Sequence, residues 1–328
     1  MDHRDIVVIA ASRGAIPVLK KLIAAFPADF PAAVCIVLHI GRHKSVFPEM
    51  LTEWGVLPAR HPKSGERLER RQIYVAPPDR HMILLGGKVR LLDTAAENFA
   101  RPAADPLFRS AAMEFGPRVV GVVLSGDLDD GAAGLAAVRA RGGYCVVQDP
   151  ADCEAPSMPR SALAATSADA VVKIDELAGV VDAAVRGARG REEVQVSTRP
   201  DLDREVQIGN KGVVPPEELD QIGERSALTC PNCSGTLWRM RDEQPLRYRC
   251  HTGHAFTSLS LEEGNAKRTE DGIWSAIRAV HERIILAQER RRWAEHAGSA
   301  DDVAIEQIRI EENEKLAELL REAIGIQA

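Results

Sequence analysis

Short apolar segments that alternate with helical patterns constrain the fold of this chain more than any other feature. DIVVIAA (5–11), AAVCIVL (32–38) and RVVGVVLSG (118–126) are apolar along almost their whole length. Strands of this kind are buried on both faces, which is typical of a parallel sheet. Apolar positions at helical spacing follow the first of them, over 16–23. Strand and helix patterns in alternation predict an α/β fold with a doubly wound, mainly parallel sheet.

The same alternation continues to about residue 187. QIYVAPP (72–78), GGYCVVQDP (142–150) and AVVKI (170–174) are further predicted strands, and a second helix is expected from Val46 to Trp54. HMILLGGKVRLL (81–92) has two glycines between apolar runs, which favours a hairpin with a two-residue turn.

Composition excludes several classes of protein. With 328 residues and 45% hydrophobic content, the chain can bury more than one core. The net charge of −6 gives no general attraction to nucleic acid. No apolar run reaches the roughly 18 residues that a spanning helix needs, and the N-terminus lacks the pattern of a signal peptide. We therefore expect a cytoplasmic protein with no nucleic-acid partner and no membrane insertion.

The character of the sequence changes after residue 187. A polar, charged stretch punctuated by proline and glycine follows and predicts a linker, and a group of cysteine and histidine residues comes next. The predicted organisation is a catalytic domain over 1–187, a linker over 188–225, a zinc-ribbon-like module over 226–262 and a helical hairpin over 263–328.

The helical hairpin is expected from two apolar patterns that begin near Thr269 and are separated around Gly298. Ser299 and Asp302 have the spacing of a capping box for the second helix. A coiled-coil-like seam would pair with another subunit or with a coiled-coil receptor. Its predicted residues are Ile273, Ile277, Val280, Ile284, Ala287, Ile305, Ile308, Leu316, Leu319 and Ala323.

Three polar side chains stand where predicted strands end. Ser12 follows the first strand, His39 follows the second, and Asp130 follows the strand over 118–126. The carboxyl ends of parallel strands form the ligand-binding edge of such a sheet. Serine, histidine and aspartate have the composition of a hydrolytic triad, in which a base activates the hydroxyl and a carboxylate orients the base.

Each of these residues also has a structural interpretation. Ser12 stands where a helix N-cap is expected, and His39 can bond to backbone at the end of its strand. Asp130 precedes a glycine, as turn residues often do. The GxSxG motif of many hydrolases does not occur around Ser12.

A family resemblance favours the catalytic interpretation. In order, the segments IAASRGA, VLHIGRH, YVAPPDRHM, RPAADPLFRSAA, VVLSGDLDDGAAGL and VVQDPADCEAPSMPRSAL resemble the catalytic domain of CheB-type chemotaxis protein-glutamate methylesterases. The resemblance covers roughly residues 5 to 185. It implies hydrolysis of glutamyl methyl esters on methylated chemoreceptors or receptor-like proteins, with release of methanol and with glutamine deamidation as a second activity. It also implies that catalysis needs no cofactor.

By this resemblance Ser12 is the nucleophile, His39 the general base and Asp130 the residue that orients it. His81 matches a histidine that the family places near the active site. The family's Thr-Gly-Gly after the serine is here Arg13-Gly14-Ala15, and its Gly-Met-Gly-x-Asp loop is here the segment 126–130.

These departures affect two loops that are expected to supply the oxyanion hole. Leu128 replaces a glycine of the family pattern, and glycine often supplies positive φ. Asp127 places negative charge near the oxyanion, and Arg13 is expected to offset it. The first strand starts almost at residue 1, so we expect no receiver domain of the kind that regulates well-known members.

Three functions follow from the sequence. The first is a protein-glutamate methylesterase, a serine-type ester hydrolase. The second is a binding or scaffold protein that keeps the fold with weak or no turnover, which the changed loops favour. The third is a serine hydrolase with another substrate, because fold alone does not fix the substrate.

A second constellation lies at 229–256. Cys230 and Cys233 are separated by two residues, and Cys250 and His254 by three. TLWRM and LRYRC between the two pairs are predicted to form antiparallel strands. Paired thiolate and imidazole ligands on a small ribbon are typical of a structural zinc site. Four protein ligands fill the coordination sphere of such an ion, so that no position is open for a substrate or a reacting water.

Other interpretations of the cysteines stay open at this point. His251 is an alternative fourth ligand, and unliganded thiols or a redox CxxC are further possibilities. The remaining cysteines are expected to be small apolar core residues. They are Cys35, Cys145 and Cys153.

Overall fold

The computed structural model describes residues 3–39, 41, 44–187, 200–241 and 244–325. The chain forms two compact units, Met1–Leu261 and Glu262–Ala328, and each is described by itself. In the described residues no helix is long and apolar enough to span a membrane.

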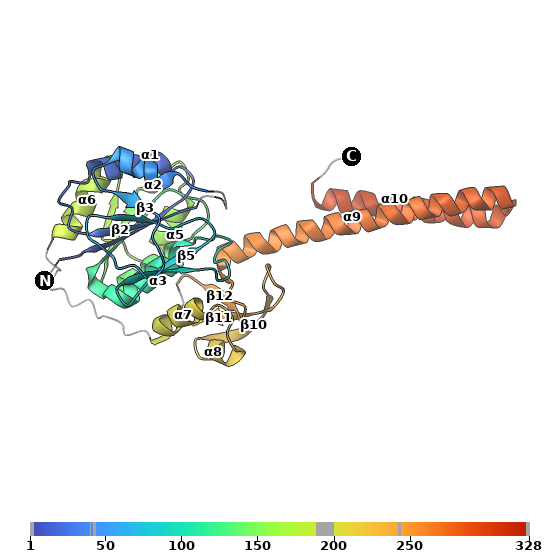
Figure 1. The fold of residues 1–328 in the computed structure, drawn as a ribbon. Coiled ribbons are helices and arrows are strands. Elements are labelled where there is room, and N and C mark those ends of the chain that lie inside the picture. The colour runs from blue at the N-terminus through green and yellow to red at the C-terminus, as the bar shows by residue number, and fades with distance from the viewer. Residues whose placement is uncertain (1–2, 40, 42–43, 188–199, 242–243, 326–328) are drawn as a thin grey trace. The chain divides into compact units, whose positions relative to one another are not determined.

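A seven-stranded sheet forms the centre of the first unit (Figure 1). Its order is β3-β4-β2-β1-β7-β8-β9, and all neighbouring strands are parallel. β1 and β2 are buried along their whole length because apolar side chains occupy both faces. The strands are β1 (Ile6–Ala11), β2 (Ala33–Leu38), β3 (Ala59–Arg60), β4 (Ile73–Val75), β7 (Val119–Val123), β8 (Tyr144–Gln148) and β9 (Ala170–Val172).

Helices cover both faces of this sheet. One face packs against α1 (Ala15–Ala25), α2 (Phe47–Trp54) and α6 (Ile174–Arg186). The other packs against α3 (Ala104–Phe115) and two further helices. Those are α4 (Ala132–Ala140) and α5 (Ser157–Ala165). The predicted doubly wound α/β fold is therefore confirmed.

The predicted hairpin is also present. β5 (His81–Leu85) and β6 (Lys88–Leu92) pair antiparallel and are joined at Gly86 and Gly87. Both glycines have positive φ, 61° and 68°, as a two-residue primed turn requires.

The stretch expected to be a linker is folded from residue 200 onward. It contains α7 (Pro200–Lys211) and α8 (Pro216–Asp220). α7 packs against α3, and its Glu205 is 2% exposed and ion-paired with arginines. Glu205 is thus one charged residue of this polar stretch that is held in the folded structure by buried ion pairs. Residues 188–199 lie outside the described residues.

A small antiparallel sheet follows, with the order β10-β11-β12-β13. The predicted pair, TLWRM and LRYRC, forms its two central strands. The strands are β10 (Gly223–Thr229), β11 (Thr236–Met240), β12 (Arg247–Cys250) and β13 (Ala255–Thr257). We call residues 223–257 the ribbon.

Two long helices end the chain, α9 (Ser258–Ala297) and α10 (Ala300–Ala323). α9 begins at Ser258, well before the predicted start near Thr269, because it continues directly from β13. The expected capping box also differs. The Ser299 hydroxyl donates to the Asp302 carboxylate at 2.6 Å and accepts no hydrogen bond from the helix backbone.

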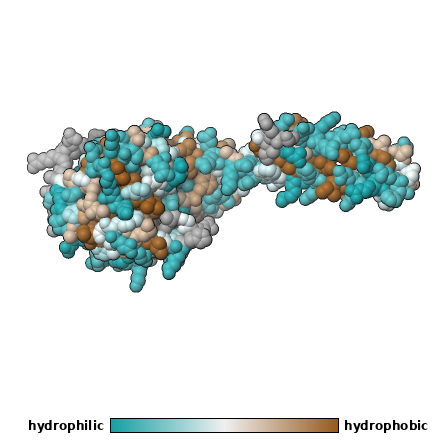
Figure 2. All heavy atoms as spheres, turned by 90° about the horizontal axis from the view of Figure 1, so that it is seen from above, coloured by the Kyte–Doolittle hydropathy of each residue, from teal (hydrophilic) through white to brown (hydrophobic). Residues whose placement is uncertain are grey.

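The seam between the two helices agrees with the prediction on α9 only. Ile277, Val280, Ile284 and Ala287 are buried on α9, whereas α10 buries Ile310 and Ala317 together with two polar residues. The prediction for α10 was wrong because this helix carries two apolar stripes and one partner helix covers only one of them. Brown spheres in Figure 2 lie among teal ones on these helices. The predicted residues left exposed are Ile305, Ile308, Leu316, Leu319 and Ala323.

Candidate active site

The register of three neighbouring strands brings Ser12 and His39 to one edge of the sheet. Ala11 in β1 pairs with Leu38 in β2, so the next residues of both strands leave the sheet side by side. The His39 amide donates to the Ala11 carbonyl at 3.0 Å, and the Ser12 amide donates to the Ser125 carbonyl at 3.0 Å. The backbone hydrogen bonds between the strands thus continue one residue past their ends, and they fix the Cα positions of Ser12 and His39.

Ser12, His39 and Asp130 line one cavity of about 780 Å³ at this edge. A cavity of this size is in the range of small-molecule and side-chain binding sites. Ser12 and His39 are partly exposed, while Asp130 is 2% exposed. The other lining residues are Gly41, Asp79, Ala95, Ala96, Asn98, Phe99, Ala100, Arg101, Pro102, Asp127, Leu128, Asn232 and His254.

The His39 imidazole and the Asp130 carboxylate are in direct contact, with Nε2 2.8 Å from Oδ2. Asp130 also accepts the backbone amides of Ala104 and Asp105, at 2.5 and 3.1 Å, which are the first two residues of α3. Burial raises the pKa of Asp130, but His39 and these amides outweigh it, so the pKa lies below its ordinary value. The carboxylate is held ionised at a helix N-terminus.

Asp105 is buried beside Asp130 and has the opposite tendency. Burial, and then the charge of Asp130, raise the pKa of Asp105. Its carboxyl accepts amides from Gly131 and Gly134 at 3.0 and 2.6 Å, which ties the loop after β7 to α3.

Ser12 is not the cap of the helix that follows it. The N-cap of α1 is Gly14, which has φ 76°. A side chain at Gly14 would lie 2.6 Å from the Glu154 Cβ, so this turn requires glycine. The Ser12 carbonyl accepts from Ala15, and its hydroxyl remains at the cavity.

The loop after β7 follows a path of the kind that glycine often takes. Leu128 has φ 58°, the left-handed conformation that was expected to need glycine. Neighbouring contacts hold the loop: the Gly126 amide donates to Ala155 O at 2.8 Å, and the Met158 amide donates to Gly126 O at 2.9 Å. The leucine is thus accommodated at the cost of backbone strain.

Arg13 and Asp127 form a two-pronged ion pair. Nε and Nη2 of Arg13 donate to the two carboxylate oxygens, each at 2.7 Å. Both side chains are more than half exposed, at 59% and 55%. The hydrogen bond to Asp127 raises the pKa of Arg13. The arginine therefore balances the charge that Asp127 brings to the cavity.

His81 lies elsewhere. It is 1% exposed and lines a separate, smaller cavity, without Ser12. Its Nε2 contacts Ala95 O at 3.0 Å, and its Nδ1 accepts the Ala103 amide at 3.2 Å. Burial lowers its pKa. Both ring nitrogens are engaged with backbone, so this histidine supports the loop at 95–103 from behind.

The sequence analysis missed that loop as a cavity wall. Asn98 is 7% exposed, and its amide nitrogen donates to Asp105 Oδ2 at 3.1 Å and to Asp130 Oδ1 at 3.4 Å. Asn98 lies in the segment ENFA (97–100), which has no strand or helix pattern. The only sequence signal for a role at the site was the position of this segment just before RPAADPLFRS.

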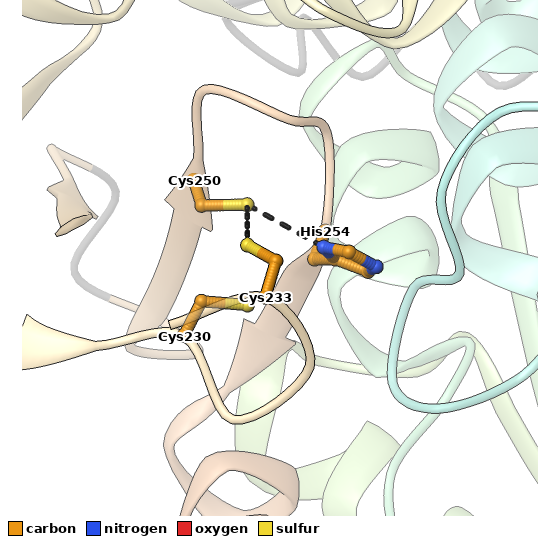
Figure 3. Close-up of side chains that lie close together, drawn as sticks. All are labelled: Cys230, Cys233, Cys250 and His254. Atoms are coloured by element: carbon orange, nitrogen blue, oxygen red, sulfur yellow. Dashed lines mark hydrogen bonds between the residues drawn. The ribbon is translucent and has the colours of Figure 1, made fainter. Parts of the chain in front are cut away.

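Cys230, Cys233, Cys250 and His254 form a compact cluster in the ribbon (Figure 3). Their ligand atoms all lie within 4.8 Å of one another. Cys233 Sγ is 3.8 Å from Cys250 Sγ, and Cys250 Sγ is 3.6 Å from His254 Nδ1. Sulfurs about 2.3 Å from a tetrahedral zinc are about 3.8 Å apart, so the donor set and its spacing fit that ion.

His254 rather than His251 belongs to this cluster. The His251 ring packs edge-on against Trp238, with centroids 6.5 Å apart. Cys35 and Cys145 are buried core residues, as expected, and burial raises the pKa of both thiols. Cys153 is only partly buried, which differs from the expected core position.

Comparisons with known proteins agree with the fold. The family model described as CheB methylesterase matches residues 7–181. The protein-glutamate methylesterase/protein-glutamine glutaminase 3 of Anaeromyxobacter dehalogenans is 40% identical over 53% of this chain and 52% of its own. A putative enzyme of the same name from Leptospira interrogans is 34% identical over 53% of this chain and 91% of its own.

The solved catalytic domain of the Thermotoga maritima CheB methylesterase superimposes with a TM-score of 0.52 at 28% identity, covering 55% of this chain and 97% of that one. This chain spans about half the length of the Anaeromyxobacter relative. The family model ends at residue 181, before the ribbon and the helical hairpin. Through its N-terminal half, the chain belongs to the CheB methylesterase family.

Proposed function

We propose that this protein is a protein-glutamate methylesterase that uses Ser12, His39 and Asp130 as a catalytic triad. One observation carries the proposal: the three side chains line the same cavity, and His39 Nε2 lies 2.8 Å from Asp130 Oδ2. Hydrolysis is the activity named for the relatives, and serine, histidine and aspartate at a sheet edge supply the chemistry for it.

In the proposed reaction the Ser12 hydroxyl attacks the ester carbonyl of a methylated glutamate. With Nε2 paired to Asp130, Nδ1 of His39 is the nitrogen that takes the serine proton. The ionised Asp130 stabilises the imidazolium that forms. The tetrahedral intermediate collapses, and its methoxide leaves as methanol after receiving that proton from His39.

A water molecule then completes the cycle. His39 removes a proton from the water, which attacks the acyl-enzyme carbonyl, and Ser12 leaves with that proton. The products are a glutamate carboxylate and the regenerated hydroxyl. A glutamine amide passes through the same steps with ammonia as the first product.

Backbone amides are proposed to stabilise the oxyanion. Ser12, Asp127 and Leu128 of the two loops line the cavity, and backbone donors in such a position are worth about 10²–10³ in turnover. The fixed path of the second loop, with Leu128 at φ 58°, keeps its amides in a defined orientation.

The proposed substrate is a methylated chemoreceptor or a receptor-like protein. We also propose zinc as a structural ion of the ribbon. Cys230, Cys233, Cys250 and His254 would hold the zinc, and the ester chemistry itself needs no cofactor. A zinc ion with four protein ligands contributes folding energy to a small module and leaves no position for substrate.

A scaffold with weak turnover remains the second candidate. The observation that favours it is Asp127, whose carboxylate lines the cavity where negative charge is expected to develop.

Methanol release from a methylated chemoreceptor fragment tests both. Ser12→Ala is expected to lower turnover by at least about 10³-fold. Ser167→Ala is the matched control, because Ser167 is exposed and outside the cavity. No methanol from the wild-type protein, with receptor binding retained, would favour the scaffold. Turnover of other esters but not of the receptor would indicate a different substrate.

A further inference from the structure

The ribbon, which the family model does not include, forms part of the cavity wall. Asn232, in the turn between Cys230 and Cys233, lines the cavity. His254, the fourth member of the Cys/His cluster, lines it as well. Both metal-binding turns of the ribbon therefore face the space that contains Ser12.

Strand β13 also holds the loop at 95–102 from the ribbon side. The Asn98 amide donates to the Ala255 carbonyl at 2.8 Å, next to His254. The Asn98 side-chain oxygen accepts from the Thr257 amide at 3.0 Å and from the Ser260 hydroxyl at 2.9 Å. The residues that follow the histidine ligand thus fix Asn98.

Glu97, the residue before Asn98, is held by buried ion pairs. Arg249, which precedes the ligand Cys250, donates to Glu97 at 2.5 Å, and both side chains are almost fully buried. Arg109 of α3 donates to the same carboxylate at 2.5 Å. Buried charges are stable only when they are paired, and Glu97 is paired with both Arg109 and Arg249.

The backbone of the loop needs these contacts. Asn98 and Phe99 have φ 49° and 60°, two consecutive left-handed residues that are not glycine. Such a conformation persists only where surrounding structure holds it. Phe99 packs against Phe256 of β13, with ring centroids 5.1 Å apart.

One side chain connects this arrangement to the proposed triad. Asn98 receives hydrogen bonds from Thr257 and Ser260 on its oxygen, and it donates from its nitrogen to Asp105 and Asp130. The amide thus bridges the ribbon and the carboxylate that contacts His39.

We propose that the metal-loaded ribbon is a working part of the esterase site, and that Asn98 is the positioning residue through which it holds Asp130 and the loop at 95–102. The proposal rests on the proposed function of the Ser12 cavity. The zinc ion, by joining Cys250 and His254 to the turn that contains Cys230 and Cys233, would fix the two points that hold Glu97 and Asn98. Loss of the ion is then a loss of active-site order.

Zinc removal from the full chain tests whether the ion keeps Asn98 and strand β13 in place. Hydrogen exchange of the backbone amides of Asn98 and Thr257 is measured before chelation, after it, and after Zn²⁺ is added back. Exchange of both is expected to accelerate at least about tenfold without zinc and to return with it, while β1 amides stay protected. Unchanged exchange at Asn98 and Thr257 would overturn the proposal.

Labelling of Ser12 by a fluorophosphonate tests the catalytic half on the same samples. The labelling rate is expected to fall at least about tenfold without zinc and to recover with it. Equal rates with and without zinc would overturn this half. If Ser12 is not a nucleophile, no sample is labelled at all, whereas the exchange result is unaffected, so the two failures are distinguishable.

Two variants of Asn98 separate positioning from simple support. Asn98→Asp keeps an oxygen that can accept from Thr257 and Ser260, but it loses the donors to Asp105 and Asp130. If Asn98 positions Asp130, both Asn98→Asp and Asn98→Ala lower kcat for a small nitrophenyl ester at least about tenfold with little change in KM. Rescue of kcat by aspartate would show mere support of β13 and would contradict the assignment.

Asn210→Ala is the matched control, because Asn210 is exposed and outside the cavity. Zinc content and hydrogen exchange at Thr257 are measured for each variant to show that the ribbon remains folded. If neither Asn98 variant folds, the zinc-removal experiment on the wild-type chain decides the proposal.

Discussion

His39 and Asp130 are 91 residues apart in the chain, and their side chains meet with Nε2 2.8 Å from Oδ2. The contact depends on three elements, because β2 supplies the histidine, the loop after β7 supplies the aspartate, and the first amides of α3 hold the carboxylate. The buried carboxylate thus fixes one nitrogen of the imidazole, and His39 lines the same cavity as Ser12.

The first prediction concerns Asp130. Asp130→Asn keeps the shape of the side chain but removes the charge that stabilises the imidazolium. Methanol release is expected to fall by about 10³–10⁴-fold. Asp79→Asn, at the cavity edge and paired with Arg101, is the control and should change turnover far less. Comparable losses for both variants would argue against a triad.

The second prediction concerns the Arg13–Asp127 pair. Arg13→Ala leaves the Asp127 charge unbalanced beside the developing oxyanion and is expected to lower kcat about three- to tenfold. Adding Asp127→Asn to that variant should restore most of the loss. A double-mutant cycle of kcat at low and high salt measures the coupling, which salt should weaken because both side chains are exposed. Additive effects would contradict the assignment.

The third prediction concerns backbone strain at Leu128. Leu128→Gly relieves the strain of the left-handed conformation at φ 58°. The same substitution increases the entropy of the unfolded chain and removes a half-buried side chain. The free energy of unfolding of Leu128→Gly should lie within about 1 kcal/mol of the wild type. Leu163→Gly, in helix α5, should lose about 2 kcal/mol or more in the same urea titration. Similar losses at both positions would refute strain at Leu128.

The fourth prediction concerns Asp129. Burial raises the pKa of Asp129 to about 6, from 3.8. Between these values the native state holds a proton that the unfolded state has released, so the free energy of unfolding falls as pH rises from about 4 to about 6. Relative to wild type, Asp129→Asn should be more stable by about 2 kcal/mol at pH 7 and nearly equal at pH 4.

Urea unfolding at both pH values checks this difference. Comparing the variant with the wild type at each pH removes the contribution of other titrating groups. Oδ1 of Asp129 is buried and has no hydrogen-bond partner among the described residues, which is consistent with a free-energy cost of ionising this carboxyl in the native state. A difference that does not change with pH would contradict the raised pKa.

The fifth prediction concerns metal content. The purified chain should bind one zinc ion, measured by elemental analysis, and Cys250→Ser should lose it because three protein ligands bind zinc far more weakly. Cys35→Ser is the control, since Cys35 lies in the core of the sheet. Zinc retained at full occupancy after Cys250→Ser would contradict the assigned ligand set.

The sequence was sufficient wherever the outcome depends on local pattern. Apolar runs predicted the parallel strands, and two glycines predicted the hairpin at 86–87. Because each parallel strand presents its carboxyl end at the same edge, the residues just after the strands could be placed together before any coordinates. Short spacing within 230–254 did the same for the Cys/His cluster.

Errors arose where partners come from distant parts of the chain. Polar composition suggested a linker over 188–225, but Glu205 within it is buried against Arg247, and no local pattern encodes such a pair. Periodicity on α10 allowed two apolar faces, and packing against α9 selected the one with Ile310. His81, expected near the active site, contacts the backbone of the loop at 95–103 and does not itself line the cavity that contains Ser12.

By itself the sequence determined the fold class, the strand ends that carry Ser12 and His39, and three of the four members of the Cys/His cluster, because these follow from periodicity and from short spacing. Only the tertiary structure decided that β13 and Asn98 connect that cluster to Asp130. The reason is physical: a hydrogen bond or buried ion pair between residues more than a hundred positions apart depends on where packing brings the chain, and this is not written in any local pattern.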